Sequence, residues 1–103
     1  MALSSILGSF FAGVLLVNGV PHFVQGICGH RHMTPFKADS SAVVNVLWGF
    51  VNFLAGEWLL RLSKGPIWEP SEVAAFWAGG FCIAVFLAAF WSNPDARLPW
   101  HKD

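Results

Sequence analysis

The sequence predicts an all-α membrane protein with three transmembrane helices, arranged as an antiparallel up-down-up bundle. Hydrophobic residues make up 55% and charged residues 12% of the 103 residues, against roughly 25% charged residues in typical soluble domains. The charged residues also leave three long gaps: before Arg31, between Asp39 and Glu57, and between Glu72 and Asp95. Because a helix needs about 20 apolar residues to cross a bilayer, each gap can hold one span.

The first predicted span covers residues 3–25 and is kinked near Pro21. Proline removes one backbone hydrogen bond, and its ring clashes with the carbonyl four residues earlier, at Val17. Gly26 is suited to end the helix in a left-handed conformation. A cleavable signal peptide is not expected, because there is no basic segment before the apolar run and Pro21 stands near the place of a cleavage site.

The second and third predicted spans cover residues 41–62 and 72–92. Ser40 or Ser41 is suited to cap the second helix, and Ser71 is suited to cap the third. Asn93 precedes a proline and therefore resists the helical conformation, which ends the third span. Residues 1–103 then form a single transmembrane domain with a cytoplasmic loop at 26–40, an outer loop at 63–71 and a tail at 93–103.

The basic residues predict the orientation of these spans. The first loop and the C-terminal tail carry four of them, and the second loop with the adjoining helix end carries two, Arg61 and Lys64. Because cytoplasmic segments are enriched in Lys and Arg, we expect the N-terminus outside and the C-terminus in the cytoplasm. Glu57 lies four residues before Arg61, which predicts an ion pair near the outer interface.

Small and polar residues follow one face of the second span. They recur at spacings of four, four, three and four residues: Ser41, Asn45, Gly49, Asn52 and Gly56. Helices in membranes associate through close packing of small residues and through hydrogen bonds between helices. The pattern predicts a helix-packing seam, in which Gly79 of the third span provides a similar close contact. An Asn-lined path for a ligand or an ion is the alternative.

The first span carries a matching row of polar residues, Asn18, His22 and Gln25, at i, i+4 and i+7. Antiparallel neighbours place His22 and Asn45 at similar depth. We therefore expect an intramembrane cluster of Asn18, His22, Gln25, Ser41 and Asn45, continued by Asn52. An ionisable residue inside a membrane indicates a functional site by default, whereas a neutral His bonded to Asn serves equally well as a contact between helices.

A Cys-His pattern follows the first span. Cys28, His30 and His32 alternate, so an extended backbone would place them on one side, where they suit a soft metal such as Cu(I) or Zn. An ordinary surface loop and a basic patch against lipid phosphates are the alternatives. His22 could also ligate a metal, a haem or a chlorophyll. We predict no cofactor from these signals alone.

Several classes of function are disfavoured by what the sequence lacks. The formal net charge is zero, so there is no basic field for nucleic acid and no nucleic-acid partner is expected. Two Cys do not make a disulfide framework. The sequence shows no nucleophile–base pair, phosphate-binding glycine loop or H-E-x-x-H motif, so we lean toward a protein that is not an enzyme.

Residues from Asn18 to Asn52 resemble a family of small bacterial integral membrane proteins of unassigned function. The resemblance rests on N-G-x-P-H-F starting at Asn18, T-P-F starting at Thr34, and N-V-L-W-G-x-x-N starting at Asn45. It spans roughly residues 16–56 and implies a location in the bacterial inner membrane. The family pattern includes the residue matching His22 but does not require the Cys28-His30-His32 arrangement.

These observations favour a small homo-oligomer, or an accessory or structural subunit of a larger membrane complex. Its partners would be the lipid bilayer and further copies of itself or other membrane subunits. One alternative is a ligand-binding or transport module that uses the Asn18-His22-Asn45 cluster. The other is a redox subunit that binds a metal or a tetrapyrrole.

Overall fold

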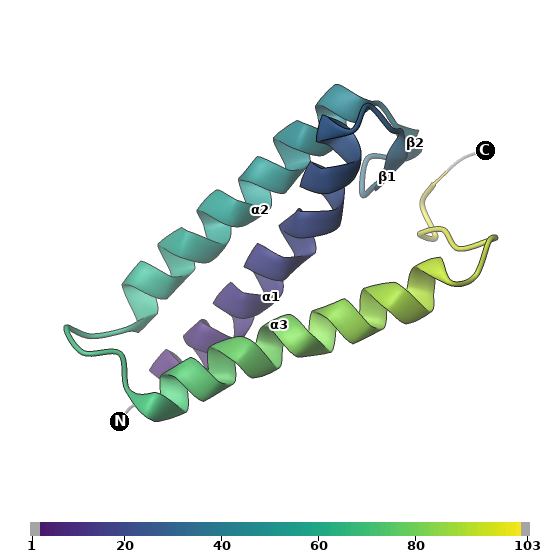
Figure 1. Ribbon diagram of the computed structural model, residues 1–103. Helices are drawn as coiled ribbons and strands as arrows, with labels where there is room; N and C mark the ends of the chain where they lie inside the picture. Colours follow the sequence, from purple (N-terminus) through teal and green to yellow (C-terminus); the bar gives the residue numbers. More distant parts are fainter. Residues whose placement is uncertain (1–2, 102–103) are drawn as a thin grey trace.

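Three long helices dominate the computed structural model, which describes residues 3–101 (Figure 1). They are α1 (Leu3–Ile27), α2 (Ala42–Ser63) and α3 (Pro70–Trp91). All three are long and apolar enough to cross a membrane. This confirms the prediction of an all-helical fold built from three long apolar helices, as a multi-pass membrane protein requires.

Helix α1 is the centre of the arrangement. It packs against both α2 and α3, while α2 and α3 make no extended contact with each other. Figure 1 shows α3 diverging from α2 toward the end of the molecule that holds the C-terminus. The helices therefore form an open arrangement around α1 rather than a closed three-helix bundle, and one flank between α2 and α3 stays uncovered.

The α1–α2 contact is close enough for backbones to touch. A Cβ added to Gly49 would lie 3.0 Å from the carbonyl oxygen of Gly19, and one added to Gly26 would lie 2.7 Å from that of Ala42. The buried residues of α2 are Asn45, Gly49, Asn52 and Gly56. Small residues allow such close approach between membrane helices, and here they leave no room for side chains.

The α1–α3 contact uses a different pair of glycines. A Cβ at Gly79 would collide with the carbonyl oxygen of Phe10, and one at Gly13 would collide with that of Phe76. Gly79 thus faces α1. The small residues that the sequence analysis singled out on α2 and α3 belong to two separate interfaces, both with α1.

Two helix ends differ from the predicted caps. Gly26 lies inside α1 and is buried against α2, so the prediction that it ends the helix is wrong. Gly29 ends α1 instead. Its φ is 78°, and the N–H of the next residue, His30, donates to the carbonyl of Gln25 at 2.9 Å.

The N-cap of α3 also differs from the prediction. It is Glu69, not Ser71, and the N–H of Glu69 donates to the Glu72 carboxylate at 2.9 Å. Ser41 caps α2, as predicted, by accepting from the N–H of Val44.

The segment between α1 and α2 folds as a short antiparallel hairpin of β1 (His32–Thr34) and β2 (Lys37–Ser40). The hydroxyls of Thr34 and Ser40 are hydrogen-bonded at 2.6 Å, and both residues are buried. A loop was predicted at residues 26–40, with an extended backbone considered only for the alternative of a metal site at Cys28, His30 and His32. Three residues are too short for the alternation that identifies a strand in a sequence.

The tail after α3 folds back onto this hairpin. The Trp100 indole N–H donates to the carbonyl of Pro35 at 2.6 Å. His101 accepts from the N–H of Leu98 through Nδ1, so its Nε2 carries the proton and donates to the carbonyl of Thr34 at 2.7 Å. The hairpin is therefore held from both sides, by α2 and by the tail.

Candidate functional site

Two hydrogen bonds join the polar residues of α1 to those of α2. The Nδ2 of Asn18 donates to Oδ1 of Asn52 at 3.1 Å, and Nδ1 of His22 lies 3.0 Å from Oδ1 of Asn45. The Asn45 side chain is fully buried, and His22 is 4% exposed. The two antiparallel helices therefore meet through two polar pairs, one turn apart on α1 and two turns apart on α2, beside the glycine contacts.

The surroundings of Asn45 fix the tautomer of His22. The Nδ2 of Asn45 lies within 2.9–3.2 Å of three carbonyl oxygens, those of His32, Ser40 and Ser41. Its Oδ1 must therefore be the acceptor toward His22, so the proton of a neutral imidazole sits on Nδ1. The other ring nitrogen, Nε2, is left with a free lone pair.

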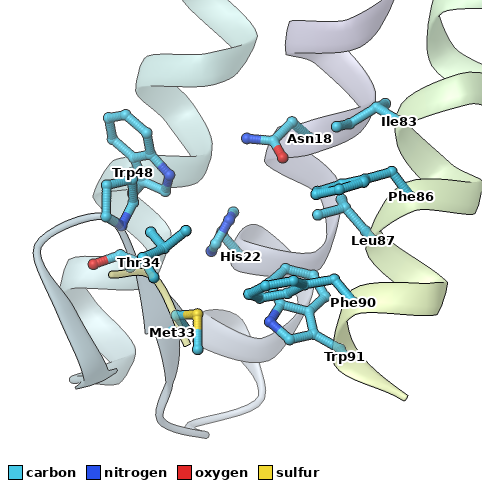
Figure 2. A pocket seen from close by; sticks show the side chains of 12 residues that line it. Asn18, His22, Met33, Thr34, Trp48, Ile83, Phe86, Leu87, Phe90 and Trp91 are labelled. Carbon is cyan, nitrogen blue, oxygen red and sulfur yellow. The ribbon is translucent and has the colours of Figure 1, made fainter. Parts of the chain in front are cut away.

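The orientation of the Asn18 amide is fixed by Asn52 in the same way. The Nδ2 of Asn52 donates to the carbonyl of Trp48 at 2.9 Å, so its Oδ1 faces α1 as an acceptor. Asn18 must then present its amide nitrogen to Asn52. Figure 2 shows this nitrogen facing α2 and the Asn18 oxygen facing the side chains of α3. The oxygen is thus an acceptor directed away from the α1–α2 contact.

Asn18 and His22 line a cavity of about 170 Å³ at the hairpin end of the helices. Figure 2 shows both side chains projecting from α1 into the space between Trp48 of α2 and the aromatic residues of α3. The rest of the lining comes from β1, its turn and the tail residue Leu98. Apart from the two polar residues of α1, the walls are mainly apolar or aromatic: Trp48, Ile83, Phe86, Leu87, Phe90 and Trp91.

The accessible polar atoms of the cavity are both acceptors. Neither Oδ1 of Asn18 nor Nε2 of His22 has a hydrogen-bond partner within residues 3–101, and neither is among the fully buried atoms that lack one. The indole N–H groups of Trp48 and Trp91 also lack a partner, but they are buried. An occupant of the cavity can therefore reach the two acceptor atoms but not the buried indole N–H groups.

His32 does not line the cavity but packs against two residues that do, Trp91 and His22. The ring centroids of His32 and Trp91 are 4.3 Å apart at an interplanar angle of 65°, and the His22 ring lies 5.3 Å from that of His32. Burial, and next the nearby His22, lower the pKa of His32 below its ordinary value. A neutral His32 at pH 7 suits its contact with the indole ring.

Two residues assigned to the polar cluster lie at its margin. Gln25 pairs with His30 through Oε1 and Nδ1 at 2.9 Å, at the exposed end of α1, and does not reach His22. Ser41 contributes only its backbone carbonyl, which accepts from Asn45. The spacing of Asn18, His22 and Gln25 places them on one face of α1, but α1 no longer contacts α2 through that face at Gln25.

Cys28, His30 and His32 are not brought together. Cys28 is exposed in the turn after α1, His30 is engaged with Gln25, and the His32 ring turns inward against Trp91. No three His, Cys, Asp or Glu side chains of the described range 3–101 are placed to hold a metal ion. The predicted alternation required an extended backbone, whereas the turn at Gly29 interrupts it.

The ion pair predicted between Glu57 and Arg61 is present on the surface of α2. The carboxylate and guanidinium atoms are 3.4 Å apart, and the side chains are 58% and 73% exposed. Exposed pairs of this kind contribute little in water. The pair lies at the opposite end of α2 from the cavity and takes no part in it.

The aromatic and tail residues of the site were not predicted from the sequence. Trp48 lies three residues after Asn45 and four before Asn52, so it belongs beside the polar face of α2. That spacing was a usable signal for Trp48. For Trp91 and Leu98 there was no such signal, because their place depends on how α3 and the tail fold back.

The chain matches no protein-family model, and no curated protein or solved structure is detectably similar to it. The resemblance to a family of small membrane proteins therefore stays a prediction.

Proposed function

We propose that this chain is a multi-pass membrane protein that binds a small lipid-soluble molecule in the cavity beside Asn18 and His22. One observation carries the proposal. Two accessible polar atoms without a partner, Oδ1 of Asn18 and Nε2 of His22, lie in an otherwise apolar cavity, and both belong to α1, which is long enough to span a bilayer. Polar atoms inside a membrane are costly when they have no hydrogen-bond partner. An occupant that bonds to them would remove that cost.

The open flank supports entry from the bilayer. Because α2 and α3 make no extended contact, the cavity is not enclosed, and Phe86 at its edge is 58% exposed. A molecule dissolved in the lipid could approach between these helices without passing through water. Cavities between membrane or bundle helices are common places for such ligands.

Location and orientation form part of the same proposal. The resemblance favours the bacterial inner membrane, and the basic residues favour an outside N-terminus and a cytoplasmic C-terminus. The cavity would then lie in the cytoplasmic half of the bilayer. A bend of α1 at Pro21, one residue before His22, would help to direct the His22 side chain into the cavity.

The orientation in the membrane can be tested by cysteine labelling. Cys28 and Cys82 are both exposed in the fold. Labelling of Cys28 by a membrane-impermeant maleimide only after cell lysis would support a cytoplasmic hairpin and C-terminus.

The binding function is tested by small molecules that copurify with the protein. Protein extracted gently from its own membranes is analysed by native mass spectrometry and by chromatography of its solvent extract. Ile83→Trp places an indole in the cavity wall, whereas Val85→Trp adds the same group at a position that is 52% exposed and does not line the cavity. We expect a bound compound in the wild type and in Val85→Trp but not in Ile83→Trp. Equal retention by both variants contradicts the proposal.

An assembly function is the second candidate, and a feature of α3 favours it. Its only buried residues in the described range are Glu72, Gly79 and Gly80, while Ala74, Ala78 and Ala88 are exposed. Exposed small residues on a membrane helix suit close packing with another helix. A mass ladder at multiples of 11.3 kDa would indicate a homo-oligomer, and additional chains would indicate a subunit of a larger complex.

The tetrapyrrole alternative fits the cavity poorly. Pockets for cofactors and drug-sized ligands measure roughly 300–1,000 Å³, whereas this cavity measures about 170 Å³. His22 has a free Nε2, as an axial ligand requires, but the space beside it does not enclose a porphyrin or chlorin ring.

A further inference from the structure

We propose that the occupant of the cavity is a phenol, meaning a lipid-soluble compound whose single ring carries a hydroxyl group, the class to which quinols belong. This inference rests on the proposed binding function and adds the chemistry of the ligand. It is carried by the juxtaposition of two acceptors, Oδ1 of Asn18 and Nε2 of His22, with aromatic walls in a cavity of one-ring size.

The accessible polar atoms select a hydrogen-bond donor. Both are held as acceptors by bonds on their far sides, Asn18 through Asn52 and His22 through Asn45. The other polar side chains of the lining are not open to an occupant: Thr34 is fully buried and bonded to Ser40, and the indole N–H groups of Trp48 and Trp91 are buried. A carbonyl compound would bring a lone pair against lone pairs, whereas a hydroxyl group supplies the missing proton. Unmatched polar groups are the strongest basis for such discrimination.

The charge of the site selects a neutral donor. Among residues 3–101, no Asp, Glu, Lys or Arg lines the cavity. An ammonium group would therefore enter a region of low dielectric without an anionic partner, which is costly inside a membrane. A hydroxyl group makes the same hydrogen bond without that cost, so a phenol is favoured over an amine.

The size and walls of the cavity select a single ring. A cavity of about 150 Å³ lined by apolar side chains holds one benzene molecule, and this cavity measures about 170 Å³. The rings of Phe86 and Phe90 stack at 5.9 Å, and Phe90 meets Trp91 edge-on at 6.2 Å. Such surfaces pair well with a further aromatic ring. Any alkyl chain on that ring would leave through the open flank.

The number of acceptors distinguishes members of the class. Asn18 and His22 each leave one acceptor atom open toward the cavity. A quinol carries two hydroxyl groups, one for each acceptor, whereas a monophenol carries one hydroxyl group for the two.

The test uses matched pairs of compounds and the whole chain in lipid nanodiscs. The first pair is 4-hexylphenol and 4-hexylanisole, which differ only by a methyl group that replaces the donated proton. The second pair is hexylhydroquinone and its oxidised form, hexyl-1,4-benzoquinone. Binding is measured relative to partition into empty nanodiscs. One hydrogen bond corresponds to about tenfold in affinity, and we expect that preference for the phenol and for the quinol.

Variants and one spectroscopic signal assign the effect to the cavity. Asn18→Ala removes one acceptor, and Asn52→Ala is its matched control because it breaks the same Asn18–Asn52 bond but keeps the Asn18 oxygen. We expect the phenol preference to be lost at this acceptor in Asn18→Ala and to fall less in Asn52→Ala, where the Asn18 oxygen remains but is no longer oriented by Asn52. In the wild type, the ¹⁵N resonance of His22 Nε2 should move upfield when 4-hexylphenol binds, independently of whether any variant folds.

The outcomes separate this inference from the proposed function. Equal affinity for 4-hexylphenol and 4-hexylanisole, or tighter binding of the quinone than of the quinol, overturns the phenol assignment and leaves the binding function standing. Binding of no compound above the empty nanodiscs overturns both. Within the class, tighter binding of hexylhydroquinone than of 4-hexylphenol assigns a quinol, and equal binding assigns a monophenol.

Discussion

The two interfaces of α1 are built on different physical principles. The α1–α2 interface combines glycine contacts with two side-chain hydrogen bonds, and one of these continues through Asn45 into the hairpin. The α1–α3 interface has glycine contacts at Gly13 and Gly79 but, near the cavity, only apolar and aromatic packing. Hydrogen bonds are directional and fix a register, whereas apolar packing tolerates small shifts.

This difference indicates which side of the molecule holds the shape of the cavity and which side admits a ligand. The polar side, made by α1, α2 and β1, sets the positions of Asn18 and His22. The apolar side, made by α3, provides the ring-binding wall and can move without breaking a hydrogen bond to α1 at the cavity. Four predictions test this division, in order of expected effect.

The largest effect is expected for Asn45→Ala. The substitution removes the acceptor for His22 and leaves the carbonyls of His32 and Ser40 without their donor. Each buried polar group without a partner costs about 1–3 kcal/mol, so we expect a loss of about 2–4 kcal/mol. Reversible unfolding in mixed detergent micelles measures the free energy of unfolding. A loss no larger than that of Asn52→Ala would show that the hairpin connection contributes nothing.

The next effect is expected for Gly79→Leu, which tests the apolar interface. A side chain at this position collides with the backbone of Phe10, so α3 must move away from α1. Overpacking of this kind costs about 1–3 kcal/mol. Distances between spin labels on α1, α2 and α3 should lengthen for the α1–α3 pair and stay unchanged for the α1–α2 pair. Movement of both pairs would show that the two interfaces are coupled.

A smaller effect is expected from pH, through His32. Its pKa in the folded protein is lowered by burial, so the folded state binds this proton less readily than the unfolded state. Stability is therefore full above the ordinary His pKa of about 6.5 and decreases as the pH falls below it through the lowered value. Hydrogen exchange of the hairpin amides at pH 7.5 and 5.5 measures this, and His32→Gln should remove most of the difference. An equal pH response in His32→Gln would assign it to another group.

The smallest effect is expected for Glu57→Gln. The pair with Arg61 is exposed on both sides, and such a pair contributes less than about 1 kcal/mol. The free energy of unfolding should change by less than about 0.5 kcal/mol, and ligand binding should not change. A larger loss would indicate that this end of α2 contacts something other than solvent or lipid.

Spacing along a helix explains why part of the site was predictable. Asn45, Gly49, Asn52 and Gly56 share a face because of the 3.6-residue period, and Asn18 and His22 share one for the same reason. The antiparallel order of two neighbouring spans then placed His22 near Asn45. The hairpin, the turn at Gly29 and the tail contacts of Trp100 and His101 were not predictable, because each depends on residues that are far apart or on segments too short to show a period.

The sequence by itself determined the three long apolar helices, since the number and spacing of charged residues leave no other way to satisfy the backbone in lipid. It also determined which residues share a helical face. Only the tertiary structure decided that α1 lies at the centre, that α2 and α3 stay apart, and that Trp48, Phe90 and Trp91 close around Asn18 and His22. The reason is that periodicity specifies the direction of a side chain on its own helix, while the partner it meets depends on the packing of all the helices at once.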